Sequence, residues 1–380
     1  MNSFSLAELA LDPCTSLSRP DADPAIPINV RSLLDRSRCV TKVRARAPLR
    51  LGFAGGGIDI APYSDIFGGC VLNATIDMFA HCSIAVRDDR KVKFVALDYE
   101  MEFEADTEEE FAFTGMLALH KAVYRRIMTN FLGGQCIPVT VKTDSDAPAG
   151  SGLGSSSTLV VAMIQAYREL LALPLSEYDV ARLAFDIERI DVGQAGGKQD
   201  QYAATFGGIN LMEFNGDQAI VNPLRIRPST LMELEARLVL YSTGVSREST
   251  KIIIEQSEIL HSGHGASLEA MHQIKRGAYV MKDALLHNDL TAFARTLGLS
   301  WEAKKRTASG ISNDEINRIF DVAYSAGADS GKVSGAGGGG FLFFTVAPEG
   351  RPRLMRALAR EAGTPKRCGF TESGAQAWRV

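Results

Sequence analysis

Residues 148–160 read PAGSGLGSSSTLV, in which three glycines alternate with serine and leucine before an apolar, partly β-branched run begins. Glycine and serine weaken regular structure, so such a stretch costs conformational entropy unless the bare backbone itself is needed. The first turn of a helix leaves N–H groups unpaired and carries partial positive charge, which favours a bound anion. The segment therefore predicts either an anion-binding loop or an ordinary capped turn in which Ser155 or Ser156 is the helix N-cap.

Two further glycine-rich stretches accompany the first. Residues 48–60 read PLRLGFAGGGIDI and residues 334–340 read SGAGGGG, each beside a predicted strand. One such loop is weak evidence for a ligand, but three of them indicate a common cleft. The middle loop lacks the Lys-Ser/Thr end of a Walker A loop, and its evenly spaced glycines do not fit the GxGxxG pattern of a dinucleotide-binding fold. Both of these nucleotide-binding motifs are therefore disfavoured.

The composition disfavours several classes of partner. The chain has 380 residues, which on a prior of about 150 residues per domain predicts two domains. The formal net charge of -4 points to neither a nucleic acid nor an anionic membrane, so a small-molecule partner is expected. The six cysteines form no CxxC pair, which predicts reduced thiols and a cytoplasmic protein. We expect no secretory signal and no membrane span.

The pattern along the chain predicts an extension followed by two domains. Residues 1–40 are expected to be a poorly ordered leader or an arm packed on the first domain. The domains are placed at 41–225 and 226–380, because NPLRIRPS interrupts the pattern at 222–229. The acidic stretch 101–110 predicts a solvated edge or turn rather than a metal site. Strands are expected within 41–54, 71–98, 136–144, 237–244 and 331–348, and helices within 117–131, 159–171, 180–187 and 250–305.

Taken in order, PLRLGFAGGGIDI, PAGSGLGSSS and KVSGAGGGG resemble the three signature motifs of the GHMP small-molecule kinases. The likeness extends from about residue 44 to the C-terminus. It implies an α+β fold, with an N-terminal domain like domain 2 of ribosomal protein S5, a ferredoxin-like C-terminal domain, and ATP bound between them. It also implies that the middle loop wraps the nucleotide phosphates. The residues expected to bind the nucleotide are Pro148, Gly150, Gly152, Leu153, Gly154, Ser155, Ser156 and Ser157.

The same resemblance implies the catalytic residues. Ser156 and Glu188 match the serine and glutamate that hold Mg²⁺ in this family. Taken alone, Glu188 is more typical of a surface ion pair to Arg189 or Arg182, but the three motifs together favour the metal role. Asp200 matches an aspartate that accepts the proton of the attacking hydroxyl or orients it. Arg50 matches a basic residue near that aspartate, where a guanidinium would stabilise developing charge. The alternative for Arg50 is a strand-edge arginine at the surface.

Residues in several loops are expected to contact the acceptor. Asp59 would bind sugar hydroxyls; it is also placed to be a helix N-cap, and the two roles are compatible. Lys198 would contact phosphate; the alternative is a solvent-exposed lysine. Arg247 follows a predicted strand and is the preferred contact for a phosphate on the substrate. Lys304, Lys305 and Arg306 are further candidates for that phosphate, although such a cluster is more typical of a solvated helix face. The glycines expected to line the acceptor site are Gly56, Gly57, Gly337 and Gly338.

Within the family, APLRLGFAGGGIDIAPYSDIFGG, GGKQDQYAA and YSTGVSRES most resemble the bacterial D-glycero-D-manno-heptose 7-phosphate kinases. That resemblance implies transfer of the ATP γ-phosphoryl group to the anomeric C1 hydroxyl, which gives a heptose 1,7-bisphosphate. Two alternatives remain open. One is an L-fucokinase-like enzyme for an unphosphorylated sugar, and the other is a catalytically silent sugar-binding or regulatory protein. The assembly expected is a monomer or a homodimer, with no nucleic acid and no membrane.

Overall fold

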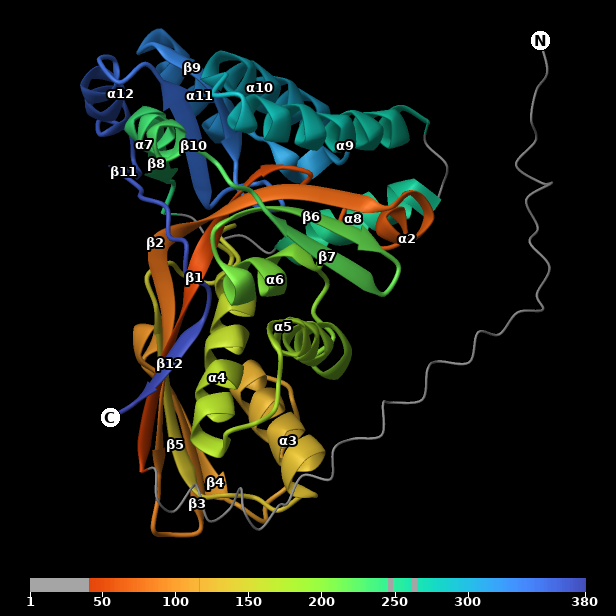
Figure 1. Cartoon of the computed structure of the whole chain (residues 1–380), viewed down its shortest axis with the longest axis vertical. Helices are drawn as coiled ribbons and strands as arrows, with labels where there is room; N and C mark the ends of the chain where they lie inside the picture. The colour runs from red at the N-terminus through yellow and green to blue at the C-terminus, as the bar shows by residue number, and fades with distance from the viewer. Residues whose placement is uncertain (1–40, 116, 245–248, 262–264) are drawn as a thin grey trace, which may run out of the picture.

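The computed structural model describes residues 41–115, 117–244, 249–261 and 265–380. In this part of the chain the strands form two sheets, one of eight strands and one of four. Figure 1 shows the larger sheet along one side of the molecule with helices against it, and the smaller sheet with its helices at one end. The mixture of antiparallel strands and packed helices is the α+β architecture expected from the sequence.

The larger sheet has the strand order β12-β1-β2-β5-β3-β4, and β6 pairs with β2 and with β7. Among these pairs only β3 and β5 run parallel. Its edge strand β4 contains the acidic stretch, so the expected solvated edge is confirmed. The strands are β1 (Lys42–Ala54), β2 (Gly69–Val86), β3 (Lys91–Ala96), β4 (Met101–Asp106), β5 (Val139–Ser145), β6 (Ile209–Asn215), β7 (Gln218–Pro223) and β12 (Gln376–Arg379).

Helices cover one face of this sheet (Figure 1). They are α3 (Ala118–Leu132), α4 (Ser155–Leu171), α5 (Glu177–Asp186) and α6 (Gln199–Phe206). Helix α4 is largely apolar because it is enclosed, with β1 and β2 on one side and α3, α5 and α6 around it. The helices expected at 117–131 and 159–171 are confirmed, but α4 begins earlier, at Ser155, directly after the glycine-rich loop.

The smaller sheet has the order β11-β8-β10-β9. Its strands are β8 (Leu238–Ser242), β9 (Ala328–Val333), β10 (Phe341–Val346) and β11 (Thr364–Lys366). The remaining helices are α2 (Tyr63–Phe67), α7 (Pro228–Arg237), α8 (Ser249–His261), α9 (Gly265–Leu286), α10 (Leu290–Lys305), α11 (Asp314–Ser325) and α12 (Arg351–Leu358). The helices expected within 250–305 are confirmed. None of the helices in the described residues has the length and apolarity needed to cross a membrane.

An apolar core joins the two sheets and fixes how the loops between them meet. Phe53 of β1 packs edge-on against Phe293 of α10 and Phe343 of β10. Helix α10 also packs against β9, and α9 packs against β1 and β2. The loops that follow β1 and β9 are therefore held close together. The proposed boundary at 222–228 lies between β7 and α7, while β12 pairs with β1; the division into 41–225 and 226–380 stays a prediction.

Candidate active site

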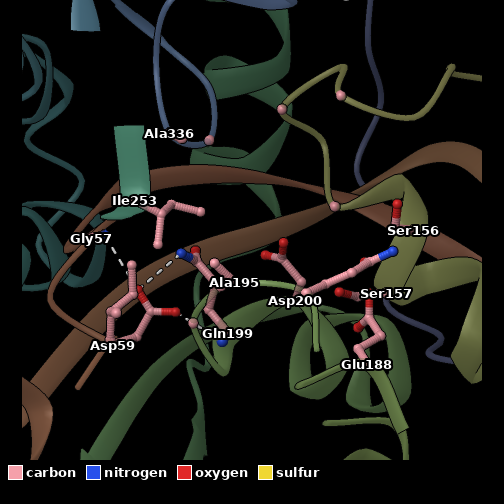
Figure 2. A pocket seen from close by; sticks show the side chains of 18 of the residues that line it. Gly57, Asp59, Ser156, Ser157, Glu188, Ala195, Gln199, Asp200, Ile253 and Ala336 are labelled. Carbon is pink, nitrogen blue, oxygen red and sulfur yellow. Dashed lines mark hydrogen bonds between the residues drawn. The ribbon is translucent and has the colours of Figure 1, made fainter. Parts of the chain in front are cut away.

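The three glycine-rich loops line one cavity of about 470 Å³, within the usual size of a small-molecule site. The first loop contributes Gly57, the second contributes residues from 149 to 157, and the third contributes Gly335 and Ala336. The second and third loops touch through their backbones, since the Phe341 N–H donates to the Ser151 carbonyl over 2.8 Å. Figure 2 shows Asp200 between Asp59 and Gln199 on one side and Ser157 and Glu188 on the other.

The second loop brings bare backbone and the first turn of α4 to this cavity. Gly150, Gly152 and Gly154 all have positive φ, and the helix begins at Ser155. The N-cap is Gly154, with no side-chain cap, so the expectation of Ser155 or Ser156 as N-cap is wrong. The hydroxyls of Ser155, Ser156 and Ser157 are thereby left on the first helical turn, and all three residues line the cavity.

The glycine at 152 is required by both conformation and space. Its φ is +81°, and a Cβ there would lie 2.4 Å from the Ser334 carbonyl oxygen. Gly134 has a similar φ of +84° but nothing within 4 Å of the same position. We expect Gly152→Ala to lower the melting temperature several degrees more than Gly134→Ala, because only the first adds a clash to the backbone strain of about 1–2 kcal/mol. Equal losses in thermal denaturation would contradict the close approach of the two loops.

Arg50, which is buried, and Asp200, which is partly exposed, form an ion pair in the cavity. Arg50 Nε and Nη2 lie 2.7 and 2.6 Å from Asp200 Oδ1, and Arg50 is only 3% exposed. Arg50 Nη1 also donates to the Gly152 carbonyl over 2.6 Å. The β1–β2 register shifts between Pro48 and Arg50, an irregularity that re-aims side chains. Arg50 is therefore directed inward, not at the surface, and within the described residues Asp200 Oδ2 has no hydrogen-bond partner.

Asp59 is buried and fixed from two directions. Its Oδ2 accepts the Gln199 backbone N–H over 3.0 Å, and its Oδ1 accepts from Gly57 N–H over 3.2 Å and from Gln199 Nε2 over 3.3 Å. The helix that follows it in sequence, α2, has Pro62 as its N-cap, so the expectation that Asp59 caps that helix is wrong. Asp59 instead holds the first residue of α6, the helix that carries Asp200.

Glu188 is completely buried beside the first turn of α4. It lies in a π-helical turn, Ile187–Asp191, that extends α5; such turns are frequent at functional sites. Its Oε2 accepts from Gln201 Nε2 over 2.5 Å, and the same amide group donates to Ser157 Oγ over 3.0 Å. Burial raises the pKa of Glu188, opposed by the Arg189 guanidinium 3.8 Å away. Within the described residues Glu188 Oε1 has no hydrogen-bond partner.

Several residues expected at the site lie away from the cavity. Lys198 donates to the Gly216 carbonyl and faces the ring of Phe185. Gly337 and Gly338 face Ile311, and Gly335 and Ala336 take their place in the lining. Arg247 lies outside the described residues. The cavity lining does not include Pro148, Leu153 or Gly56. The Leu153 carbonyl instead accepts the Arg50 backbone N–H over 3.1 Å, a contact within the protein.

The sequence pattern missed Gln199 and Gln201, and it favoured a solvated position for Lys304. Lys304 belongs to the basic cluster that was expected on a solvated helix face, but it is 1% exposed and lines the cavity. The two glutamines flank Asp200 and hold Asp59 and Glu188. Their neutral side chains carry no motif of their own, although their position on either side of Asp200 in the stretch QDQ was a usable signal.

Comparison with known proteins places the chain in a family. The model for the GHMP kinases N terminal domain matches residues 118–208, and that for the GHMP kinases C terminal matches residues 281–363. A D-glycero-alpha-D-manno-heptose 7-phosphate kinase of Campylobacter jejuni is 48% identical over 339 residues, which are 89% of this chain and 99% of that protein. The chain belongs to the GHMP kinase family. GHMP kinases are ATP-dependent phosphotransferases, so the expected kinase activity and its donor, ATP, are confirmed.

Two further relatives bear on the fold of this GHMP kinase. The crystal structure of a D-glycero-D-manno-heptose 1-phosphate kinase from Bacteroides thetaiotaomicron has 42% sequence identity and a TM-score of 0.76, covering 89% of this chain and 99% of that one. An L-fucokinase/L-fucose-1-P guanylyltransferase of Bacteroides fragilis is 26% identical, covering 85% of this chain and 37% of that protein. The two-domain GHMP kinase fold expected from the sequence is confirmed, and the fucokinase is a distant relative.

Proposed function

We propose that this GHMP kinase transfers the γ-phosphoryl group of ATP to the anomeric C1 hydroxyl of D-glycero-D-manno-heptose 7-phosphate. The observation that carries the proposal is the Arg50–Asp200 pair, which lies in the same cavity as the helix N-terminus that follows the glycine-rich loop. Relatives at 48% and 42% identity, aligned over nearly their whole length, are named for heptose phosphates and support this acceptor. The product would be a heptose 1,7-bisphosphate.

The acceptor is assigned to the side of the cavity that holds Asp59 and Asp200. Asp200 Oδ2 is available to accept the proton of the attacking hydroxyl, or to orient that hydroxyl, while Oδ1 is held by Arg50. The Arg50 guanidinium then lies where negative charge grows on the transferring group, which it stabilises. Asp59 accepts hydrogen bonds from sugar hydroxyls.

The nucleotide is assigned to the loop around Gly150, Gly152 and Gly154 and to the serine hydroxyls that follow. We propose that Ser156 and Glu188 hold Mg²⁺, which would neutralise charge on the β- and γ-phosphates. Glu188 Oε1 is buried and accepts no hydrogen bond, and its only ion-pair contact in the described residues is the Arg189 guanidinium 3.8 Å away, so a metal ion would fit at this oxygen. Among the described residues no group of three or more acidic, histidine or cysteine side chains forms a metal site, so the phosphates and water would supply the other ligands.

The remaining assignments stay predictions. Arg247 is proposed to bind the 7-phosphate, and Lys198, Gly56, Gly337 and Gly338 stay candidates for the acceptor site, although the contacts of these four residues favour a supporting role. A cytoplasmic location, a homodimer and the absence of nucleic-acid binding also stay predictions.

A substrate comparison tests the proposed function. The purified protein is incubated with ATP–Mg²⁺ and with heptose 7-phosphate, L-fucose or D-galactose, and ADP release is followed. We expect turnover with heptose 7-phosphate and a kcat/KM at least about tenfold lower with either unphosphorylated sugar, because a phosphate adds charge-assisted hydrogen bonds. Turnover of the unphosphorylated sugars alone would overturn the acceptor assignment, and no ADP release with any sugar would favour a silent protein.

A further inference from the structure

Lys304 is a buried cation whose position none of the preceding assignments explains. It lies in the last turn of α10, yet only 1% of it is exposed. Its Nζ donates to the Gly335 carbonyl over 2.7 Å and to the Gly56 carbonyl over 3.2 Å. These carbonyls belong to the third and the first glycine-rich loops. The ammonium group therefore joins the two loops at the wall of the cavity that it lines.

Lys304 has one donor more than the protein uses. An ammonium group carries three N–H donors. Two of them go to Gly56 and Gly335, and within the described residues the structure shows no acceptor for the third. A buried charged donor without a partner is unfavourable, so a ligand oxygen in the cavity is the expected acceptor.

Lys304 Nζ lies on the acceptor side of the cavity, because it donates to the carbonyl of Gly56, and the N–H of the next residue, Gly57, donates to Asp59 Oδ1. Burial lowers the pKa of Lys304 to about 8, while Asp59 and, more weakly, Asp200 oppose that shift. Arg50 lowers the same pKa by repulsion. Since the two carboxylates are the groups assigned to the sugar, the ammonium group faces the sugar more than the metal end of the cavity.

We propose that Lys304 is a substrate-contacting residue that donates its third hydrogen bond to an oxygen of the acceptor sugar. This inference rests on the proposed function, since it needs the acceptor to lie between Asp59 and Asp200.

Lys332 provides a matched control. It is also a buried lysine, and its Nζ donates to the Gly52 carbonyl over 2.8 Å. A Cβ on Gly56 would lie 3.4 Å from Lys304 Nζ and 3.9 Å from Lys332 Nζ, so the two ammonium groups flank the same loop. Only Lys304 lines the cavity. Substitution of either lysine leaves a buried carbonyl without its donor. Only substitution of Lys304 would also remove a contact with a ligand in the cavity.

The test compares Lys304→Met, Lys304→Gln and Lys332→Met with the wild-type enzyme in ADP-release kinetics, with thermal denaturation to check folding. We expect both Lys304 variants to raise the KM for heptose 7-phosphate about tenfold or more and to leave the KM for ATP within about twofold. Lys332→Met should lower the melting temperature and leave both KM values near those of the wild type. A folded Lys304 variant with an unchanged sugar KM, or with a raised ATP KM alone, would overturn the proposal.

A pH measurement on the wild-type enzyme keeps the proposal testable if both Lys304 variants fail to fold. The pKa of Lys304 is about 8, so the ammonium group loses its proton as pH rises through that value. The groups that face it are Asp59, Asp200, Arg50 and Lys332. We expect the sugar KM to rise between pH 7 and pH 9 more than the ATP KM does; parallel changes would overturn the proposal. Failure of the proposed function would be recognised by a different result, because the wild-type enzyme itself would then not turn over heptose 7-phosphate.

Discussion

Asp200→Asn is expected to lower kcat by about 10²-fold or more, while ATP still binds with an affinity within about threefold of the wild type. The asparagine keeps the shape of the side chain, and its carbonyl oxygen can still accept from Arg50. It loses the negative charge and the proton-accepting oxygen at Oδ2. We expect nucleotide affinity to be preserved because the loop that we assign to the phosphates contacts Arg50 through the Gly152 carbonyl, which the substitution does not touch. Steady-state ADP release and nucleotide titration measure the two quantities.

Asp191→Asn is the matched control for this result. Asp191 is also an aspartate paired with an arginine, since its Oδ2 accepts from Arg126 Nε over 2.8 Å, but it lies outside the cavity. Loss of that ion pair should cost some stability and leave kcat near the wild-type value. Wild-type turnover in Asp200→Asn, or an equal loss of turnover in Asp191→Asn, would remove Asp200 from the proposed chemistry.

Most of the fold could be predicted because its signals are local. The three glycine-rich loops and the helix at 118–132 follow from short runs of sequence. The start of α4 was misplaced for a physical reason: its first turn consists of serines, which are poor helix formers. They are helical here because the preceding glycine-rich loop packs against the third loop and fixes where the helix begins.

The site was harder to predict because its side chains are positioned by segments far away in the chain. Lys304 sits in SWEAKKRTAS, which has the composition of a solvated helix face, and its burial depends on carbonyls at positions 56 and 335. Asp59 has the sequence position of a cap for the next helix, yet it binds the start of a helix 140 residues later. Lys198 directly precedes the stretch QDQ that contains Asp200, but its ammonium group donates to the Gly216 carbonyl.

Glu188→Gln is expected to lower kcat at saturating ATP by about 10²-fold or more and to raise the Mg²⁺ concentration required for half-maximal rate. The amide keeps the size of the side chain but removes the charge that would bind the ion. Without metal, the variant should be at least as stable as the wild type. Burial raises the pKa of Glu188, so the folded state loses stability as pH rises above the ordinary pKa of a glutamate, and a neutral amide avoids this cost.

Glu255→Gln is the control, because it is expected to change the stability of the fold in the opposite direction. The Glu255 carboxylate accepts a hydrogen bond from the Ser309 N–H over 2.8 Å. Hydrogen bonds from Ser309 lower the pKa of Glu255. A group with a depressed pKa stabilises the folded state at pH values above the usual pKa of glutamate. At pH 7 the Glu255→Gln variant should therefore have a lower melting temperature than the wild type and an unchanged kcat. Magnesium titrations and thermal denaturation of both variants separate the two roles. A Glu188→Gln enzyme with a lowered melting temperature, full turnover and an unchanged Mg²⁺ requirement would make Glu188 part of the core, and the metal assignment at the end of α5 would fail.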